Sequence, residues 1–147
     1  MDKFGLQSYL YKHIPLSQAI GVEVVEASPE AVILSAPLSP NVNHQGTVFA
    51  GSASAVGLLS AWALLFIRLQ SAKLENAGVV ANNSMVYYRP ITGTFTATAA
   101  MTDTTAWQRF RNTLQQKNRA KLTLTSVLHC KGELVAELTG EFVALGE

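Results

Sequence analysis

The sequence predicts an α+β domain in which one long apolar helix is wrapped by an antiparallel β-sheet. Residues 48–67 are uncharged over twenty positions, which is the composition of a helix buried on all sides. Much of the remaining chain falls into short β-rich runs bounded by turn residues, which is typical of strands. The 147 residues contain no linker-like segment, so we expect one domain over residues 1–147.

The first third of the chain is expected to contain a short helix followed by a β-hairpin. Residues 4–13 form a short amphipathic segment. Residues 20–27 and 31–38 are rich in β-forming side chains, and Ser28, Pro29 and Glu30 between them are typical turn residues. We therefore predict two antiparallel strands joined by this turn.

The uncharged run at residues 48–67 has two interpretations. Its length is about that of a helix that crosses a bilayer. Small and polar residues such as Ser54 interrupt it, however, and a single span would leave the predicted strands unexplained. Ala53, Gly57 and Ala61 recur every four residues and form a smooth stripe against which a sheet can close. We therefore predict a core helix with no membrane partner.

Four further strands follow the long helix. They are predicted at residues 78–89, 94–102, 122–130 and 134–145, with turn signals at Pro90 to Gly93 and at Lys131-Gly132. Between the second and third of these strands, Trp107, Phe110 and Leu114 fall at i, i+3 and i+7. This spacing predicts a short helix, with Thr104 or Thr105 as its N-cap.

Charge and cysteine content exclude several classes of protein. The formal net charge is +1, so the overall balance does not indicate nucleic-acid binding. One cysteine and three scattered histidines give no metal-ligand spacing, and no cofactor motif is present. The N-terminal segment lacks a signal-peptide pattern, so we expect a cytoplasmic protein.

A candidate site lies where the polar loop at residues 41–47 leads into the long helix. Backbone N–H groups at a helix start lack intrahelical partners and favour negative charge, so they can hold a developing oxyanion. We assign catalytic roles here to Asn43, His44 and Ser52, and substrate binding to Gly46, Thr47, Phe49 and Gly51. Alternative roles are structural: a cap or turn for Asn43, a loop hydrogen bond for His44 and packing for Ser52.

Two further groups of residues are candidates for substrate binding. Asn82, Asn83 and Ser84 are polar residues within a predicted strand, where they either line a substrate channel or lie on an edge or dimer-interface strand. Arg109 and Arg111 begin a basic segment, residues 109–121, that contains no carboxylate. Such a cluster can receive phosphates or an acidic protein, or it can be an ordinary solvated face.

The predicted arrangement resembles the hotdog fold of acyl-CoA and acyl-carrier-protein thioesterases. The resemblance rests on residues 43–52, Asn-His-Gln-Gly-Thr-Val-Phe-Ala-Gly-Ser, and on residues 83–90, Asn-Ser-Met-Val-Tyr-Tyr-Arg-Pro. It is closest to the family represented by the C-terminal domain of YiiD-type proteins. It implies a homodimer, with a tetramer as a further option, active sites at the subunit interface, and an acyl thioester of coenzyme A or acyl carrier protein as substrate.

The sequence departs from the broader thioesterase pattern at the catalytic acid. Many hotdog thioesterases carry an acidic residue on the helix, whereas this chain has Leu58 at about that position. Between Glu30 and Glu133 its only carboxylates are Glu75 and Asp103. The base for hydrolysis is then His44, Glu75 or Asp103, or a water held by Asn43 and Ser52.

Three functions remain open. Thioester hydrolysis is the first, because it is the usual reaction of the broader family that the sequence resembles. Some family members are similar to malonyl-acyl-carrier-protein decarboxylases, and this reaction needs oxyanion donors but no base at the step that releases carbon dioxide. A non-catalytic acyl-binding module is the third alternative.

Overall fold

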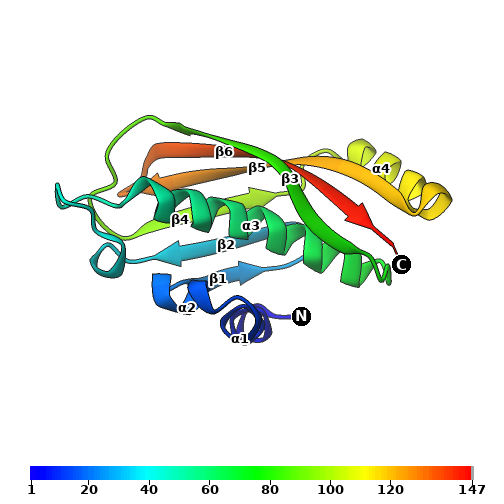
Figure 1. The fold of residues 1–147 in the computed structure, drawn as a ribbon, viewed down its shortest axis with the longest axis horizontal. Helices are drawn as coiled ribbons and strands as arrows, with labels where there is room; N and C mark the ends of the chain where they lie inside the picture. The colour runs from blue at the N-terminus through cyan, green and yellow to red at the C-terminus, as the bar shows by residue number, and fades with distance from the viewer. Residues whose placement is uncertain (147) are drawn as a thin grey trace.

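The computed structural model describes residues 1–146 and has an α+β architecture. The elements in chain order are α1 (Lys3–His13), α2 (Pro15–Ile20), β1 (Glu23–Ala27), β2 (Ala31–Ala36), the 3₁₀ turn η1 (Ser39–Asn41), α3 (Ala50–Ser71), β3 (Ala77–Tyr87), β4 (Phe95–Ala100), α4 (Thr104–Lys117), β5 (Arg119–Cys130) and β6 (Glu133–Leu145). The strands form one antiparallel sheet in the order β1-β2-β4-β5-β6-β3, and α3 lies along one face of it (Figure 1). The predicted hotdog arrangement is therefore confirmed.

The small residues of α3 let the helix approach the sheet closely. Ala53 and Ala61 are almost completely buried, as is Gly57. A Cβ atom added to Gly57 would lie 3.3 Å from Leu128 Cδ1 and 3.4 Å from the Cβ of Leu138, so these neighbours would have to shift by a few tenths of an ångström to admit a side chain. The stripe predicted from the sequence is thus the contact surface between α3 and the sheet.

α3 is the core helix of the domain. By length and composition it could cross a membrane, but its apolar side chains pack against the sheet, and Val56, Leu64 and Leu65 are fully buried. Its interior face also carries Ser60, whose hydroxyl donates to Gly57 O at 2.8 Å and lies 2.6 Å from the hydroxyl of buried Ser126 on β5. The prediction of a buried helix is confirmed.

Arg68 is the one charged residue of α3, and it ties the end of the helix to its neighbours. Its guanidinium stacks on Trp107 of α4, 4.4 Å from the ring centroid, and donates a hydrogen bond to Pro29 O in the β1–β2 turn. Burial lowers the pKa of Arg68, while the nearby Glu30 acts in the opposite direction. The contacts join three elements at the C-terminal end of α3.

Two local predictions were wrong. The strand expected from residue 20 begins at Glu23, because Pro15 starts the short helix α2 and Gly21, at φ 80°, ends it in the left-handed region. The N-cap of α4 is Asp103, whose carboxylate accepts a 2.9 Å hydrogen bond from Ala106 N, and not Thr104 or Thr105. Asp103 therefore has a structural role at the start of α4.

β3 is an edge strand of the sheet within the described residues. It pairs with β6 on one side, with a bulge between Val80 and Asn82, and has no strand on its other side. Asn82, Asn83 and Ser84 are exposed along it. A long edge with exposed backbone groups is a surface on which another strand can pair.

Candidate functional site

The loop before α3 is built around the side chain of Asn43. Its Oδ1 accepts hydrogen bonds from Gln45 N at 2.9 Å and Thr47 N at 3.1 Å, and its backbone N–H donates to Thr47 O at 2.7 Å. Gly46 completes the turn at φ 79°, where a glycine avoids backbone strain. Asn43 therefore fixes the shape of the loop, as the structural alternative proposed.

The amide nitrogen of Asn43 is also engaged within this loop. Its Nδ2 donates to Thr47 Oγ1 at 2.9 Å and lies 3.4 Å from Val48 O. To donate to a substrate, this group must exchange the bond to the Thr47 hydroxyl for one to the ligand. The structural role of Asn43 in the loop is compatible with a role in substrate binding. Its role as an oxyanion donor stays a prediction.

The start of α3 presents unpaired backbone donors. Phe49 N donates to Asn41 O at 2.7 Å, while Ser52 N and Ala53 N share Phe49 O at 3.0 and 3.2 Å. No acceptor within residues 1–146 meets the N–H groups of Ala50 and Gly51, and no side chain caps the helix. These two donors at the positive end of the helix dipole are suited to an oxyanion.

Phe49 and Gly51 form one steric unit beside these donors. The Phe49 side chain is 58% exposed, yet a Cβ atom on Gly51 would lie 2.4 Å from Phe49 Cε2. The ring can occupy its position only because residue 51 has no side chain. Phe49 thus provides an apolar surface at the helix start.

Tyr87 at the end of β3 is a site residue that the sequence analysis did not assign. Its hydroxyl donates to Ala50 O at 2.9 Å, which joins the end of β3 to the first residue of α3. Burial raises the pKa of the Tyr87 phenol, and hydrogen bonding with Ser54 opposes that rise. Tyr87 appeared in the family motif, but only the fold reveals its contact with the helix.

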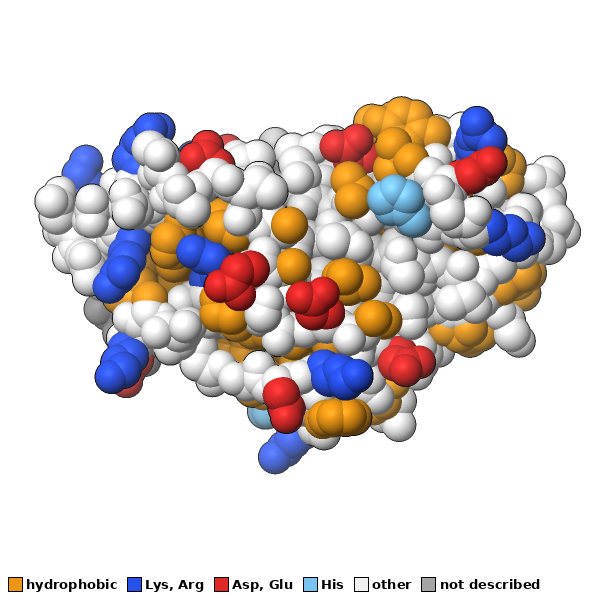
Figure 2. Space-filling model, turned by 180° about the vertical axis from the view of Figure 1, so that it is seen from behind, with side chains coloured by type: hydrophobic (Ala, Val, Ile, Leu, Met, Phe, Trp, Pro, Cys, Tyr) orange, Lys and Arg blue, Asp and Glu red, His pale blue; other side chains and the backbone are white. Residues whose placement is uncertain are grey.

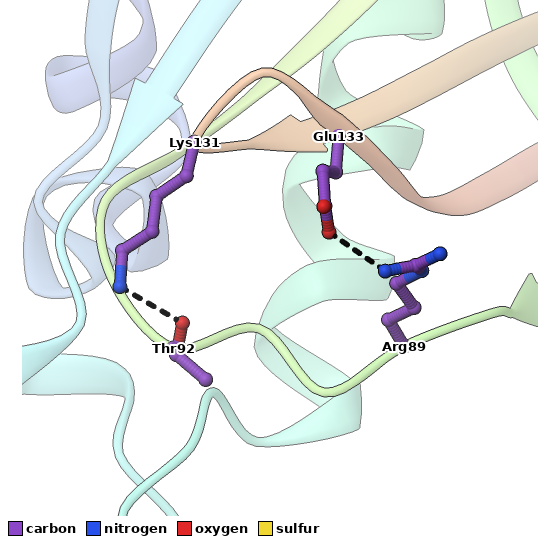
Figure 3. A network of polar contacts seen from close by, with 4 residues as sticks. All are labelled: Arg89, Thr92, Lys131 and Glu133. Carbon is purple, nitrogen blue, oxygen red and sulfur yellow. Dashed lines mark hydrogen bonds and ion pairs between the residues drawn. The ribbon is translucent and has the colours of Figure 1, made fainter.

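The helix start and the end of β3 line a common cleft. Its volume is about 490 Å³, and its walls come from the loop of Asn43, from Ala50 and Ala53, and from residues 87–91. Two exposed contacts, shown in Figure 3, join the chain beyond β3 to the turn between β5 and β6: Arg89 pairs with Glu133 at 2.9 Å, and Lys131 Nζ donates to Thr92 Oγ1 at 3.2 Å.

The backbone donors at the helix start are not bonded to any carboxylate of the described residues. Among residues 1–146, no carboxylate bonds to a group at the start of α3. Glu133 and Glu137 bond to Arg89 and Tyr88, whereas Glu75 lies beyond the opposite end of α3. The carboxylates that contact the wall of the cleft are therefore held by Tyr88 and Arg89, and none of them is bonded to the helix start.

The other predicted residues are divided between the two ends of the molecule. His44 is exposed and Ser52 is half-buried near the helix start, and neither side chain has a hydrogen-bond partner in the described residues. Arg109 and Arg111 are exposed on α4, at the other end of α3 (Figure 1). Figure 2 shows Lys and Arg side chains gathered at the α4 end of the molecule, on the left of that view.

Arg109 lies beside a groove between α4 and β5. The groove, of about 410 Å³, is also lined by Lys121, Thr113 and Thr123. Lys121 has a single long contact with Glu141, at 3.8 Å, so much of its charge remains available to a ligand. As for metals, residues 1–146 contain no group of three or more His, Cys, Asp or Glu that could hold an ion.

Comparison with known proteins identifies the family. The family model described as "Putative thioesterase (yiiD_Cterm)" matches residues 4–146. The chain belongs to this family. The resemblance seen in the sequence is therefore confirmed for almost the whole length of the chain.

Solved structures of similar proteins share the fold. A protein from Shewanella oneidensis described as a "putative thioesterase" is 26% identical, with 98% of this chain and 97% of that chain covered and a TM-score of 0.87. A protein of unknown function from Chlorobaculum tepidum has 23% identity, coverage of 99% and 94%, and a TM-score of 0.92. A thioesterase from Haemophilus influenzae has 11% identity, coverage of 99% and 92%, and a TM-score of 0.78.

Proposed function

We propose that this chain is an acyl-thioester hydrolase whose reaction takes place at the start of α3. The observation that carries the proposal is the pair of unpaired N–H groups of Ala50 and Gly51, which open beside the cleft lined by Asn43 and Tyr87. Family membership supports the same class of reaction. We further propose a cytoplasmic protein, because the apolar helix belongs to the core.

In the proposed mechanism, the thioester carbonyl oxygen accepts hydrogen bonds from Ala50 N and Gly51 N, with Asn43 Nδ2 as a third donor. A water molecule attacks the carbonyl carbon and loses a proton to His44, which is exposed in the adjoining loop. The resulting oxyanion is stabilised by the helix start. The carbon–sulfur bond then breaks, and His44 returns the proton to the departing sulfur. The products are the free thiol and the carboxylic acid.

Malonyl-thioester decarboxylation is the second candidate, and it is favoured by a helix start to which no carboxylate of residues 1–146 is bonded. Breaking the bond to the carboxylate carbon releases carbon dioxide and leaves an enolate on the thioester oxygen, which the same N–H groups would stabilise. A carboxylate beside the substrate's own carboxylate would oppose binding. None bonds at the helix start within residues 1–146.

We also propose that the active unit is a homodimer formed along the open edge of β3. In an antiparallel pairing of two β3 strands, the two copies of α3 run in opposite directions. The start of α3 in one chain would then lie toward the α4 end of its partner. Arg109 and Arg111 of the partner could thereby receive the phosphates of coenzyme A or the acidic face of a carrier protein.

One experiment distinguishes the candidate functions. Malonyl and octanoyl thioesters of coenzyme A and of acyl carrier protein are incubated with the protein and analysed by mass spectrometry. A free thiol indicates hydrolysis, and an acetyl thioester formed from the malonyl substrate indicates decarboxylation. Thioesters that all remain intact would overturn both enzymatic proposals and leave the acyl-binding module.

A further inference from the structure

The side chain of Tyr87 connects the sheet to the first turn of α3. Tyr87 is the last residue of β3, where it pairs with Ala136 of β6, so its backbone is held in the sheet. Its hydroxyl donates to Ala50 O at 2.9 Å, and both residues line the cleft at the helix start. A side chain that projects from a paired strand can fix the position of the backbone group to which it bonds.

The carbonyl that Tyr87 bonds belongs to the same peptide group as one of the proposed oxyanion donors. The peptide bond between Ala50 and Gly51 is planar and trans, so Ala50 O and Gly51 N–H point in opposite directions within one rigid plane. A contact that fixes the direction of Ala50 O therefore also fixes the direction of Gly51 N–H. A hydrogen bond accepted by the carbonyl also polarises the peptide group and strengthens its N–H as a donor.

The first turn of α3 has little support from within the helix. Its N-cap is Phe49, which has no side-chain acceptor, and no side chain caps α3. Gly51 N has no acceptor within residues 1–146. Helix ends fray readily where their backbone groups lack partners. In the described residues, the bond from Tyr87 is therefore the hydrogen bond that ties this peptide group to the sheet.

Ser54, one turn further along α3, strengthens this connection. Its side chain hydrogen-bonds with Tyr87, so the phenol contacts two successive turns of the helix. The neighbouring Tyr88 differs, because its hydroxyl donates to Glu137 at 3.2 Å. Of these two adjacent tyrosines, Tyr87 is the one that bonds to the helix start.

We propose that Tyr87 is a positioning residue that holds the peptide group between Ala50 and Gly51, so that Gly51 N–H points at the thioester oxygen. The inference rests on the proposed function at the start of α3, and it adds a residue of β3 to that reaction. Tyr87 acts through the peptide group and does not bond to the substrate. Its effect is largest in the transition state, where the charge on the oxygen is greatest.

Backbone dynamics of the free protein test the positioning role directly. The protein is produced with ¹⁵N-labelled glycine, and the order parameter of Gly51 N–H is measured in the wild type and in Tyr87→Phe. We expect a rigid value of about 0.85 in the wild type and a value below about 0.6 in Tyr87→Phe. Because Tyr87 is 47% exposed, phenylalanine can replace it without repacking of the core.

Steady-state kinetics test the consequence for the reaction. Removing an oxyanion donor costs about 10²–10³-fold in kcat, so a donor that is present but misdirected should cost about tenfold. We therefore expect Tyr87→Phe to lower kcat about tenfold and to change KM less than about twofold. The substrate is the thioester that the wild type hydrolyses fastest.

Tyr11→Phe is the matched control. Tyr11 of α1 donates its hydroxyl to Val22 O, so this substitution also removes a bond from a phenol to a backbone carbonyl. No residue of α1 lines the cleft. This variant should lose stability but keep the wild-type kcat and the wild-type order parameter of Gly51.

The outcomes separate this inference from the proposed function. If the wild type hydrolyses thioesters, an unchanged Gly51 order parameter in Tyr87→Phe overturns the positioning role, whether or not kcat falls. An unchanged kcat overturns it as well, because the reaction would then not depend on the direction of this N–H. If the wild type leaves all thioesters intact while Gly51 becomes mobile in Tyr87→Phe, the hydrolase is overturned and the control of the peptide group by Tyr87 stands.

Discussion

At the scale of single residues, Asn43 combines a structural role in the loop with a proposed role as an oxyanion donor. Substitutions can separate these two roles. An aspartate at this position keeps an oxygen where Oδ1 accepts hydrogen bonds from Gln45 N and Thr47 N. Its second oxygen can accept a hydrogen bond from the Thr47 hydroxyl in place of the bond that Nδ2 now donates. Alanine, in contrast, removes all of these loop contacts.

We therefore predict that Asn43→Asp folds normally but loses about 10²–10³-fold in kcat, because a negative charge faces the developing oxyanion. Asn43→Ala should lose less activity per folded molecule but more stability, about 1–3 kcal/mol, because backbone donors of the loop lose their acceptor. Steady-state kinetics and urea unfolding measure the two effects. Retained or increased hydrolysis in Asn43→Asp would show that residue 43 lies where a base belongs.

Tyr87 allows a prediction with a defined pH dependence. Tyr87→Phe removes the hydrogen bond to Ala50 O and should cost about 0.5–1 kcal/mol of stability near neutral pH. The pKa of this phenol is raised in the folded chain, so above pH 10 the folded state holds more protons than the unfolded state. The contribution of Tyr87 to stability should therefore fall as the pH rises above 10.

Urea unfolding of wild type and Tyr87→Phe between pH 8 and 11 measures this contribution. The difference in unfolding free energy between the wild type and Tyr87→Phe should become smaller at the highest pH values. A difference that widens with pH would mean that the phenolate, and not the phenol, is the form stabilised by folding.

At the scale of elements, the buried hydroxyl pair between α3 and β5 predicts unequal effects of two similar substitutions. In Ser126→Ala, Ser60 keeps its bond to Gly57 O. In Ser60→Ala, the hydroxyl of Ser126 is left buried without its partner, which costs about 1–3 kcal/mol. We therefore expect Ser60→Ala to be the more destabilising change.

The double variant Ser60→Ala, Ser126→Ala provides the control. It no longer contains a buried hydroxyl without a hydrogen-bond partner, and it should be more stable than Ser60→Ala alone. Thermal or urea unfolding of the three variants measures the order. If the double variant loses as much unfolding free energy as the two single variants together, the two hydroxyls do not couple α3 to β5.

Helices and strands differ in how readily the sequence predicts them. α3 and the strands of the sheet were predicted because apolar runs and alternation are local patterns. The sequence does not predict α2, because six residues are too few to show a helical period and the β-branched Ile20 at its end favours a strand. The cap of α4 shifted to Asp103 because several neighbouring residues can all cap a helix.

At the scale of the whole molecule, the separation of the helix start from α4 makes the dimer testable through activity. If the partner's basic segment docks the substrate, Arg109→Ala combined with Arg111→Ala should raise KM and weaken its salt dependence, with little change in kcat. Unchanged kinetics at low and high salt would assign these side chains to a solvated face.

Mixing two defective chains tests whether one site draws on both subunits. A heterodimer of Asn43→Asp with the Arg109, Arg111 double variant contains one site with an intact helix start and an intact basic segment, if these come from different chains. We therefore expect mixing to restore a low KM with up to half of the wild-type kcat. No restoration after verified subunit exchange would contradict a shared site.

The sequence by itself determined the fold class and the family of this protein, because the features that identify them are local patterns or short motifs. The uncharged run predicted α3, the stripe of Ala53, Gly57 and Ala61 predicted its contact with the sheet, and residues 43–52 indicated the family and the helix start. These features depend on periodicity and residue type, which do not require knowledge of distant contacts.

Only the tertiary structure decided which groups meet at the site. It brought Tyr87 to Ala50 across 37 residues of sequence, engaged the Asn43 amide with Thr47, and placed the basic segment at the far end of α3. Such relations arise from sheet order and register, because strands far apart in the chain lie side by side only after folding.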